Sequence, residues 1–307
     1  MNKKVSAIII SILFLAGLSL LLYPFIANQW NNYRQKQLLS DYEAEVSEKA
    51  ASGMIDYQAE WAKVQAYNAA LLPSILPDSF ENAENSQEDE EYMSSLNLTG
   101  NGMMGYVQIP KINVRLPIFH TTEEDILQTA AGHLEGSSLP AGGPDTHAVI
   151  SAHRGLPSAS LFTDLDKLKK GDYFFLYILD DSLCYQVDKI SVVKPDQTKD
   201  LSVEEGQDLV TLLTCTPYGV NSHRLLVRGH REPYIGVDEE GTPASLIGTS
   251  LRTSYLLWVL VGLGVTGAFI LFLYSREVKE KRKRNLPVSK PTEPENTPTE
   301  TRHKDGE

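Results

Sequence analysis

Two long uncharged apolar stretches constrain this chain more than any other feature of its sequence. Residues 5–26 form a run of 22 and residues 255–274 a run of 20. A helix rises about 1.5 Å per residue, so either run can cross a hydrocarbon core of roughly 30 Å. A cleaved signal peptide is the alternative for the first run, but its length and the lack of a small-residue cleavage site favour an uncleaved anchor. We therefore expect two transmembrane helices.

Basic residues next to these stretches predict their orientation. Lys3 and Lys4 precede the first run, and six Lys and Arg residues follow the second between positions 276 and 284. Cytoplasmic flanks of membrane spans are enriched in such residues. We expect a two-span protein of the cell membrane with cytoplasmic ends, 1–4 and 275–307, and an extracytoplasmic region, 28–254. The end of the tail is rich in Pro, Thr and Glu and is expected to be disordered.

The charge balance excludes some partners. The chain has 28 Lys and Arg against 40 Asp and Glu, a net charge of −12. Nucleic-acid binding needs a basic face, so we expect no nucleic-acid partner. Two cysteines are too few for a disulfide framework.

The extracytoplasmic region divides into four parts. Residues 28–72 are rich in helix formers and predict one or two helices. Residues 73–102 are acidic and contain prolines, which predicts a long loop. Residues 103–233 are β-rich, and 234–254 form a linker to the second span. Predicted strands lie at 106–109, 114–118, 148–153, 173–179, 184–193, 210–216 and 223–231, and short helices at 122–130 and 160–168. This pattern predicts a mainly β fold, a closed barrel with short helices.

Cys215 is the candidate nucleophile. It ends a predicted strand, and Arg224 begins the next one. If the two strands are antiparallel neighbours, Arg224 lies beside Cys215, where a cation favours thiolate and stabilises a developing oxyanion. The alternative is a small buried cysteine beside a structural arginine.

A cysteine nucleophile also needs a proton carrier for its leaving group. His153 stands at a strand end comparable to that of Cys215, while His147 lies about 20 Å earlier on the same strand. Spacing alone prefers His153 only modestly.

Other uses of these residues have weaker support. The sequence lacks the CxxC, HxxxH and HExxH spacings, so we expect no metal site. A disulfide between Cys184 and Cys215 is an alternative that would abolish the nucleophile.

Several motifs resemble the sortase family. TLLTCTPYGVNSHRLLVRG resembles the sortase TLxTC…R signature, and HAVISAHRGLPSASLFTDLDKLKKGD resembles the segment around the sortase histidine. The stretch GHLEGSSLPAGG, the N-terminal helices, the acidic loop and the second span resemble class C, pilin-polymerising sortases.

The resemblance implies a β-barrel transpeptidase that needs no cofactor. It implies Cys215 as nucleophile, His153 as general acid and base, Arg224 as clamp for substrate and oxyanion, and Thr214 as a substrate-positioning residue. The implied reaction cleaves an LPxTG-like sorting signal between Thr and Gly and joins pilins through a lysine isopeptide bond. The implied partners are pilin subunits with such a signal and an acceptor lysine, and the membrane. A cell-wall precursor or a housekeeping sortase is a further partner left open.

One position departs from the class C pattern. The loop before the barrel carries Asp78-Ser79-Phe80 where class C sortases carry Asp-Pro-aromatic as a lid. We expect Asp78 and Phe80 to form the lid, and the loss of proline predicts a more mobile one because proline fixes φ.

Three alternatives remain at this stage. One is a housekeeping-type sortase that anchors proteins to the cell wall, and another is a non-catalytic scaffold for pilus assembly. A transpeptidase acting on peptidoglycan stem peptides is less favoured, because its His-Gly-Cys neighbourhood is missing around Cys215.

Overall fold

The computed structural model describes residues 3–71, 76, 78–80 and 89–233, with eight isolated positions between 262 and 279. Residues 1–250 form one compact unit and residues 251–307 a second. The fold described here is that of the first unit. The predicted linker 234–254 and most of the predicted second span 255–274 lie outside the described residues.

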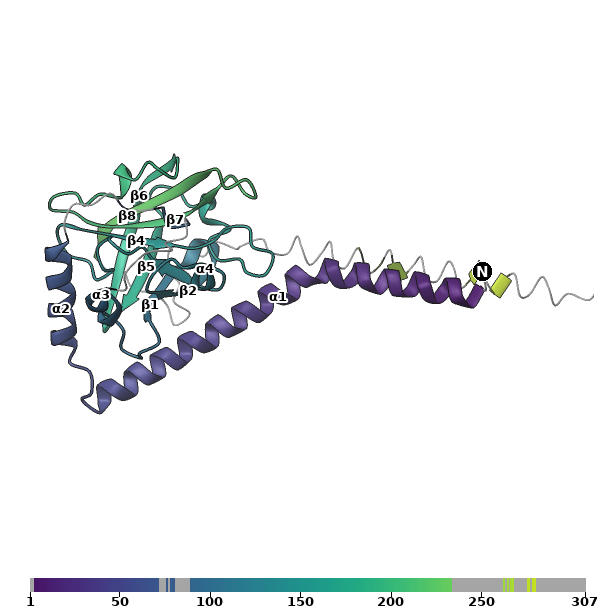
Figure 1. The fold of residues 1–307 in the computed structure, drawn as a ribbon, viewed down its shortest axis with the longest axis horizontal. Helices are drawn as coiled ribbons and strands as arrows, with labels where there is room; N and C mark the ends of the chain where they lie inside the picture. The colour runs from purple at the N-terminus through teal and green to yellow at the C-terminus, as the bar shows by residue number, and fades with distance from the viewer. Residues whose placement is uncertain are drawn as a thin grey trace, which may run out of the picture. The chain divides into compact units, whose positions relative to one another are not determined.

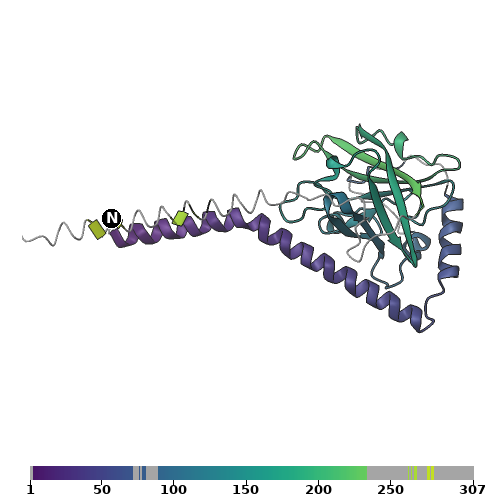
Figure 2. The same ribbon diagram turned by 180° about the vertical axis from the view of Figure 1, so that it is seen from behind.

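A single helix, α1 (Lys3–Ala51), contains the first apolar stretch and the first predicted helix of the outer region (Figure 1). An 18-residue window of this helix has a mean hydropathy of 2.4 and is not buried, so the helix is long and apolar enough to cross a membrane. The second helix, α2 (Tyr57–Ala70), begins at Asp56, whose carboxylate accepts a hydrogen bond from the backbone N–H of Ala59. Such a cap satisfies an N–H that has no partner within the helix. Figure 2 shows α1 and α2 from the opposite side.

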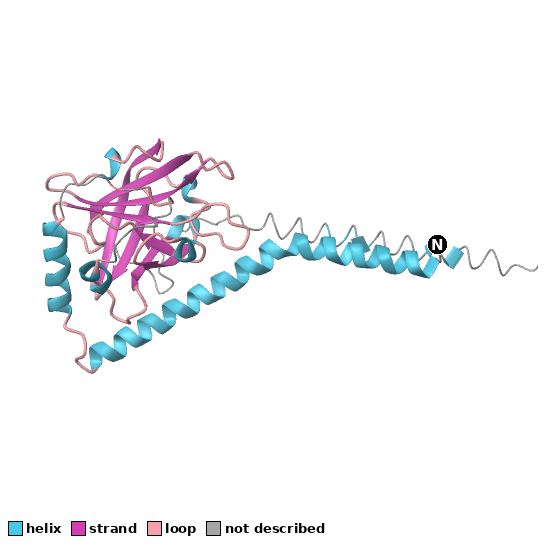
Figure 3. Ribbon diagram, in the orientation of Figure 1, coloured by secondary structure: helices cyan, strands magenta, loops and turns pink. Residues whose placement is uncertain are grey.

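Eight strands close into a barrel in the order β1-β2-β3-β4-β7-β8-β6-β5. The strands are drawn in magenta in Figure 3. Closure leaves no unpaired sheet edge, because β1 also pairs with β5. The strands are β1 (Met103–Ile109), β2 (Val114–Phe119), β3 (Ala131–His133), β4 (Thr146–Ser151), β5 (Tyr173–Ile178), β6 (Asp181–Val193), β7 (Asp208–Thr216) and β8 (His223–Glu232). One short helix, α3 (Glu90–Ser94), precedes the barrel. Between the strands lie the short helix α4 (Glu124–Leu127) and the 3-10 turns η1 (Pro110–Ile112), η2 (Leu165–Lys167) and η3 (Lys199–Leu201).

Side chains on the two faces of β7 and β8 belong to two different apolar clusters. Leu212 and Val227 belong to the main core inside the barrel. Leu213 and Leu226, one residue along each strand, belong to a second cluster outside it. Successive side chains of a strand point to opposite faces, so one pair of strands serves both clusters. The outer cluster also contains Leu76 from the segment before the barrel.

The C-terminal part of α1 packs on the barrel. Leu39, Tyr42 and Val46, at helical spacing, form a third buried cluster with Met103 and Tyr106 of β1. These contacts fix the helix to the domain through burial of apolar side chains.

The structure corrects several sequence predictions. The seven predicted strands are confirmed with small shifts in their ends, but β3 was missed. The predicted helix 160–168 is wrong: only the 3-10 turn η2 forms there, and Leu161 has a φ of 37°, which a right-handed helix does not allow. The predicted helix 122–130 shortens to α4, and the predicted loop 73–102 contains α3. The strand expected to end at His153 ends at Ser151.

Candidate active site

Cys215 and Arg224 lie directly opposite each other, where β7 ends and β8 begins. The two residues are register partners in an antiparallel pair. Cys215 is 5% exposed and Arg224 8% exposed, so both are nearly removed from water. The parity of each strand places both on the outer face, which also carries Leu213 and Leu226. The predicted proximity of a thiol and a guanidinium is confirmed.

Two residues of the segment before the barrel cover Arg224. Its Nε donates to Oδ1 of Asp78 at 2.7 Å, and a second contact joins Nη2 to Oδ2. The Phe80 ring lies 5.2 Å from the guanidinium carbon, which is a cation–π distance. The same ring lies 5.2 Å from the imidazole of His153. One aromatic side chain therefore contacts both the arginine and the histidine.

This covering segment, residues 76 and 78–80, is held by two further contacts. Leu76 is buried in the outer apolar cluster. Ser79, which stands where the class C pattern has proline, is also buried, and its Oγ accepts a hydrogen bond from Ser151 Oγ at 2.8 Å. Proline could not make this contact, so the departure from the pattern adds a polar attachment to β4. The expected greater mobility of the lid remains a prediction.

His153 follows β4 by two residues and is oriented from two sides. Its backbone carbonyl accepts from Phe162 N at 3.1 Å, and its Nε2 lies 3.1 Å from Oε2 of Glu124 in α4. A carboxylate acceptor fixes the tautomer and orientation of an imidazole. Glu124 was not predicted from the sequence, since it is one of several exposed acids and has no recognisable spacing to His153.

Thr214 points the opposite way from Cys215. It is fully buried, and its Oγ1 donates to the carbonyl oxygen of Ala152 at 2.7 Å. This bond ties the residue before the cysteine to the residue before His153. The backbone positions of Cys215 and His153 are therefore linked by a hydrogen bond between their neighbours.

Arg154, next to His153, is a further polar residue that the sequence analysis missed. Its guanidinium donates to Thr216 Oγ1 at 3.4 Å and forms an ion pair with Asp166. It also lies 6.0 Å from the centre of the Tyr218 ring. Arg154 therefore connects the segment after β4 with the end of β7.

Burial is the main cause of the shifted pKa of the Cys215 thiol. It raises the pKa of Cys215 above its ordinary value, Arg224 opposes that shift, and Asp78 adds to it. With Asp78 against Arg224, the cation that would favour thiolate is largely neutralised. The covered site therefore holds Cys215 as a thiol.

The other candidates lie elsewhere. His147 is buried, and its ring nitrogens contact Ser202 O and Thr211 Oγ1, both at 2.8 Å. Burial also lowers the pKa of His147. The disulfide alternative is wrong, because neither Cys184 nor Cys215 forms one.

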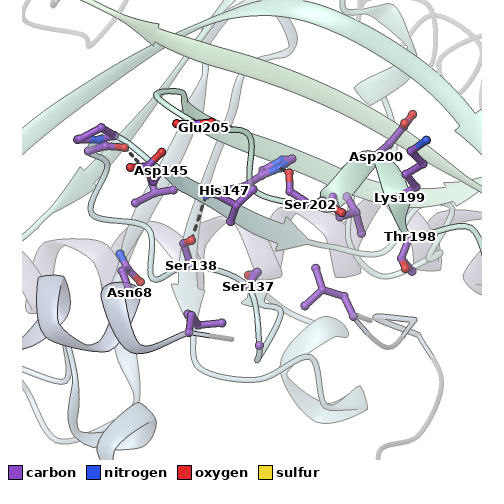
Figure 4. Close-up of a pocket in the computed structure, with 18 of the residues that line it drawn as sticks. Asn68, Ser137, Ser138, Asp145, His147, Thr198, Lys199, Asp200, Ser202 and Glu205 are labelled. Carbon is purple, nitrogen blue, oxygen red and sulfur yellow. Dashed lines mark hydrogen bonds between the residues drawn. The ribbon is translucent and has the colours of Figure 1, made fainter. Parts of the chain in front are cut away.

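A cavity of about 1360 Å³ lies beside the covering segment (Figure 4). Its walls come from α2, the start of β4, the segment before β4 and the segment between β6 and β7, with Asn68, Ser138 and His147 among the labelled residues. A second cavity of about 430 Å³ is lined by Leu76 and Asp78. Leu76 lines both cavities, whereas Cys215, His153 and Arg224 line neither.

The barrel with a cysteine and an arginine at adjoining strand ends defines a cysteine transpeptidase of the sortase type. The family described as "Sortase domain" matches residues 107–232. Sortase C1 of Streptococcus agalactiae is 48% identical, with a TM-score of 0.57, over 64% of this chain and 99% of that one. Sortase C of Streptococcus pneumoniae, described with its pilin substrate specificity, is 44% identical, with a TM-score of 0.55, over 64% of this chain and 97% of that one. "Sortase A" of Bacillus anthracis is 28% identical over 56% of this chain and 82% of that protein. The chain belongs to the sortase family, and its solved structural neighbours place it in class C.

Proposed function

We propose that this sortase joins pilin subunits at the outer face of the cell membrane, with Cys215 as the nucleophile. The observation that carries the proposal is the pairing of Cys215 with Arg224 at the ends of β7 and β8, under lid residues that also contact His153. The likeness to class C sortases, some of them described as pilus-related, supports pilins as the substrates.

The first half of the reaction forms a thioester. Once the lid has moved, the Cys215 thiol passes its proton to His153. The thiolate attacks the carbonyl carbon of Thr in an LPxTG-like signal, and Arg224, released from Asp78, stabilises the resulting oxyanion. The intermediate collapses by breaking the Thr–Gly bond. His153 gives its proton to the departing glycine amine, so the C-terminal fragment leaves as a neutral amine.

The second half resolves the thioester. A neutral lysine amine of the next pilin attacks the same carbonyl carbon and loses a proton to His153. Collapse expels the Cys215 thiolate and leaves an isopeptide bond between the two subunits. The transfer consumes no water, and the enzyme returns to its starting protonation.

The lid must move before this chemistry begins. Asp78 occupies the guanidinium that the oxyanion needs, and Phe80 lies against both Arg224 and His153. Membrane anchoring by the apolar part of α1 and by a second span at 255–274, with both termini in the cytoplasm, completes the proposal.

The test uses the purified full-length protein in detergent and peptides with an LPxTG-like signal. Wild-type protein and the lid variant carrying Asp78→Ala and Phe80→Ala should form a thioacyl adduct visible by intact mass, and Cys215→Ala should not. Addition of a pilin domain with its acceptor lysine should convert the adduct to an isopeptide product. Resolution only by a cell-wall precursor amine would favour the anchoring alternative. No adduct from the lid variant on any signal would leave the scaffold alternative.

A further inference from the structure

The helix that contains the apolar stretch continues without interruption to the catalytic domain. The uncharged run ends at residue 26, and α1 continues to Ala51. At about 1.5 Å per residue, Asn28 and Asn31 lie only about 3 and 8 Å beyond that point along the helix axis. The headgroup region of a bilayer occupies about 5–8 Å on each side of the hydrocarbon core. These two asparagines therefore fall at headgroup depth, and tilting the helix would only bring them closer to the core.

Both asparagines hold the segment that follows β4. Asn28 Oδ1 accepts hydrogen bonds from Ser160 N at 2.9 Å and from Ser160 Oγ at 2.8 Å. Asn31 Nδ2 donates to Ser158 O at 2.7 Å. The same segment begins with His153, whose carbonyl oxygen is bonded to the backbone N–H of Phe162. The loop of the proton carrier is thus attached to the membrane-proximal turns of α1.

The opposite face of these turns carries exposed aromatic and basic side chains. Trp30 is 62% exposed and Tyr33 60% exposed, and their ring centres lie 6.2 Å apart. Arg34 and Lys36 follow and are also exposed. Trp and Tyr concentrate at membrane–water interfaces, and Lys and Arg attract anionic headgroups. A large exposed tryptophan is explained by such an interface and not by packing within the domain.

We propose that α1 holds residues 153–160 in the lipid headgroup layer, so that the mouth of the active site opens at the bilayer surface. This inference rests on the proposed membrane anchoring and deepens the proposed function. It names the surface that this face of the domain meets, the lipid headgroups of the outer leaflet.

The experiment measures the depth of single labelled sites in the full-length protein. Cys215→Ala removes the near-surface thiol, and Cys184 is fully buried. A fluorophore is then attached at Pro157→Cys, an exposed position of the segment, or at Met54→Cys, which is 70% exposed beyond the far end of α1. The helix ends at Ala51, about 38 Å from the end of the apolar stretch, and the second site lies just beyond it. The proteins are reconstituted in phosphatidylcholine–phosphatidylglycerol vesicles whose headgroups carry a nitroxide quencher.

The proposal predicts loss of most of the fluorescence at position 157 and little loss at position 54. Asn28→Ala with Asn31→Ala should reduce quenching at position 157, while the matched change Asn32→Ala should not. Equal quenching at both sites, or none at either, overturns the inference; in the second case the exposed aromatic face of α1 is covered by a protein partner instead.

Cleavage of a soluble sorting peptide by the unlabelled enzyme in detergent is measured in parallel. Cleavage without quenching at position 157 means that this inference alone fails. Quenching without cleavage by wild-type protein or by the lid variant means that the proposed function fails while the placement at the membrane stands.

Discussion

The ion pair between Asp78 and Arg224 should control access to the thiol, and Asp78→Asn tests this with almost no change in volume. The side chains are 4% and 9% exposed, so the pair is little screened by water. A hydrogen bond to a charged group contributes about 1.5–3 kcal/mol, and the amide keeps part of the geometry of the two bonds. A net loss of about 2 kcal/mol from the closed state corresponds to a roughly 30-fold larger open fraction.

The same substitution should change the acidity of Cys215. Asp78 contributes to the raised pKa of this thiol, whereas Arg224 lowers it. Removing the carboxylate leaves the arginine unopposed, so the pKa falls. The variant should therefore react faster at every pH below the thiol pKa, and its rate profile should shift to lower pH.

The assay is the rate of Cys215 alkylation by iodoacetamide between pH 5 and 9, followed by intact mass. Cys184 is fully buried and serves as an internal control for unfolding. Glu90→Gln is the matched control, because it removes an exposed acid in the same acidic segment. A rate within twofold of wild type for Asp78→Asn, with the fold intact, would refute the view that this pair gates the site.

Three further predictions follow from other contacts. Glu124→Gln should lower kcat for thioester formation about 3- to 10-fold with little change in KM, because it weakens the orientation of His153. Asp125→Asn is the control and should leave both constants unchanged in steady-state kinetics. Burial lowers the pKa of His133 to about 4. The unfolded chain takes up that proton near pH 6.5, so stability is complete above pH 6.5 and falls by about 3 kcal/mol toward pH 4. Urea unfolding of wild type and His133→Gln between pH 5 and 6.5 should show a shallower pH slope in the variant. Gly132→Ala should cost at least about 2 kcal/mol, measured by thermal unfolding, because its Cβ would lie 2.2 Å from a backbone carbonyl oxygen.

The barrel strands could be predicted because their pattern is local. The short apolar runs 210–213 and 225–227 are visible in the sequence, and the Pro and Gly residues between them are typical of a turn that joins two strands. Strand β3 has only three residues, Ala131–His133, and no such pattern. The helix predicted at 160–168 rested on the helix-like spacing of Phe162, Leu165 and Leu168. All three side chains are buried in the main core, but the segment that carries them is mostly irregular. Tertiary packing there overrides local preference.

Only the contacts between consecutive strands of the candidate site could be predicted from the sequence. The approach of Arg224 to Cys215 follows from one turn and one register. Asp78 reaches Arg224 across 146 positions of sequence, and no periodicity indicates that contact, which was expected only from the resemblance to class C sortases. Glu124 is an exposed acid on a four-residue helix, so nothing in the sequence distinguishes it from its neighbours.

Under the proposed mechanism, the contact between Asp78 and Arg224 keeps the closed site inactive. A guanidinium that donates both of its paired hydrogen bonds to Asp78 cannot donate them to an oxyanion, and the same carboxylate helps to keep Cys215 protonated. Nucleophile activation and oxyanion stabilisation are therefore lost together in the closed state and gained together when the lid leaves. A substrate that displaces the covering segment gains both at once, because its own carbonyl oxygen takes the place of the Asp78 carboxylate. Adventitious hydrolysis of a thioester is limited by the same coupling, since the site is assembled only while a peptide holds the lid away.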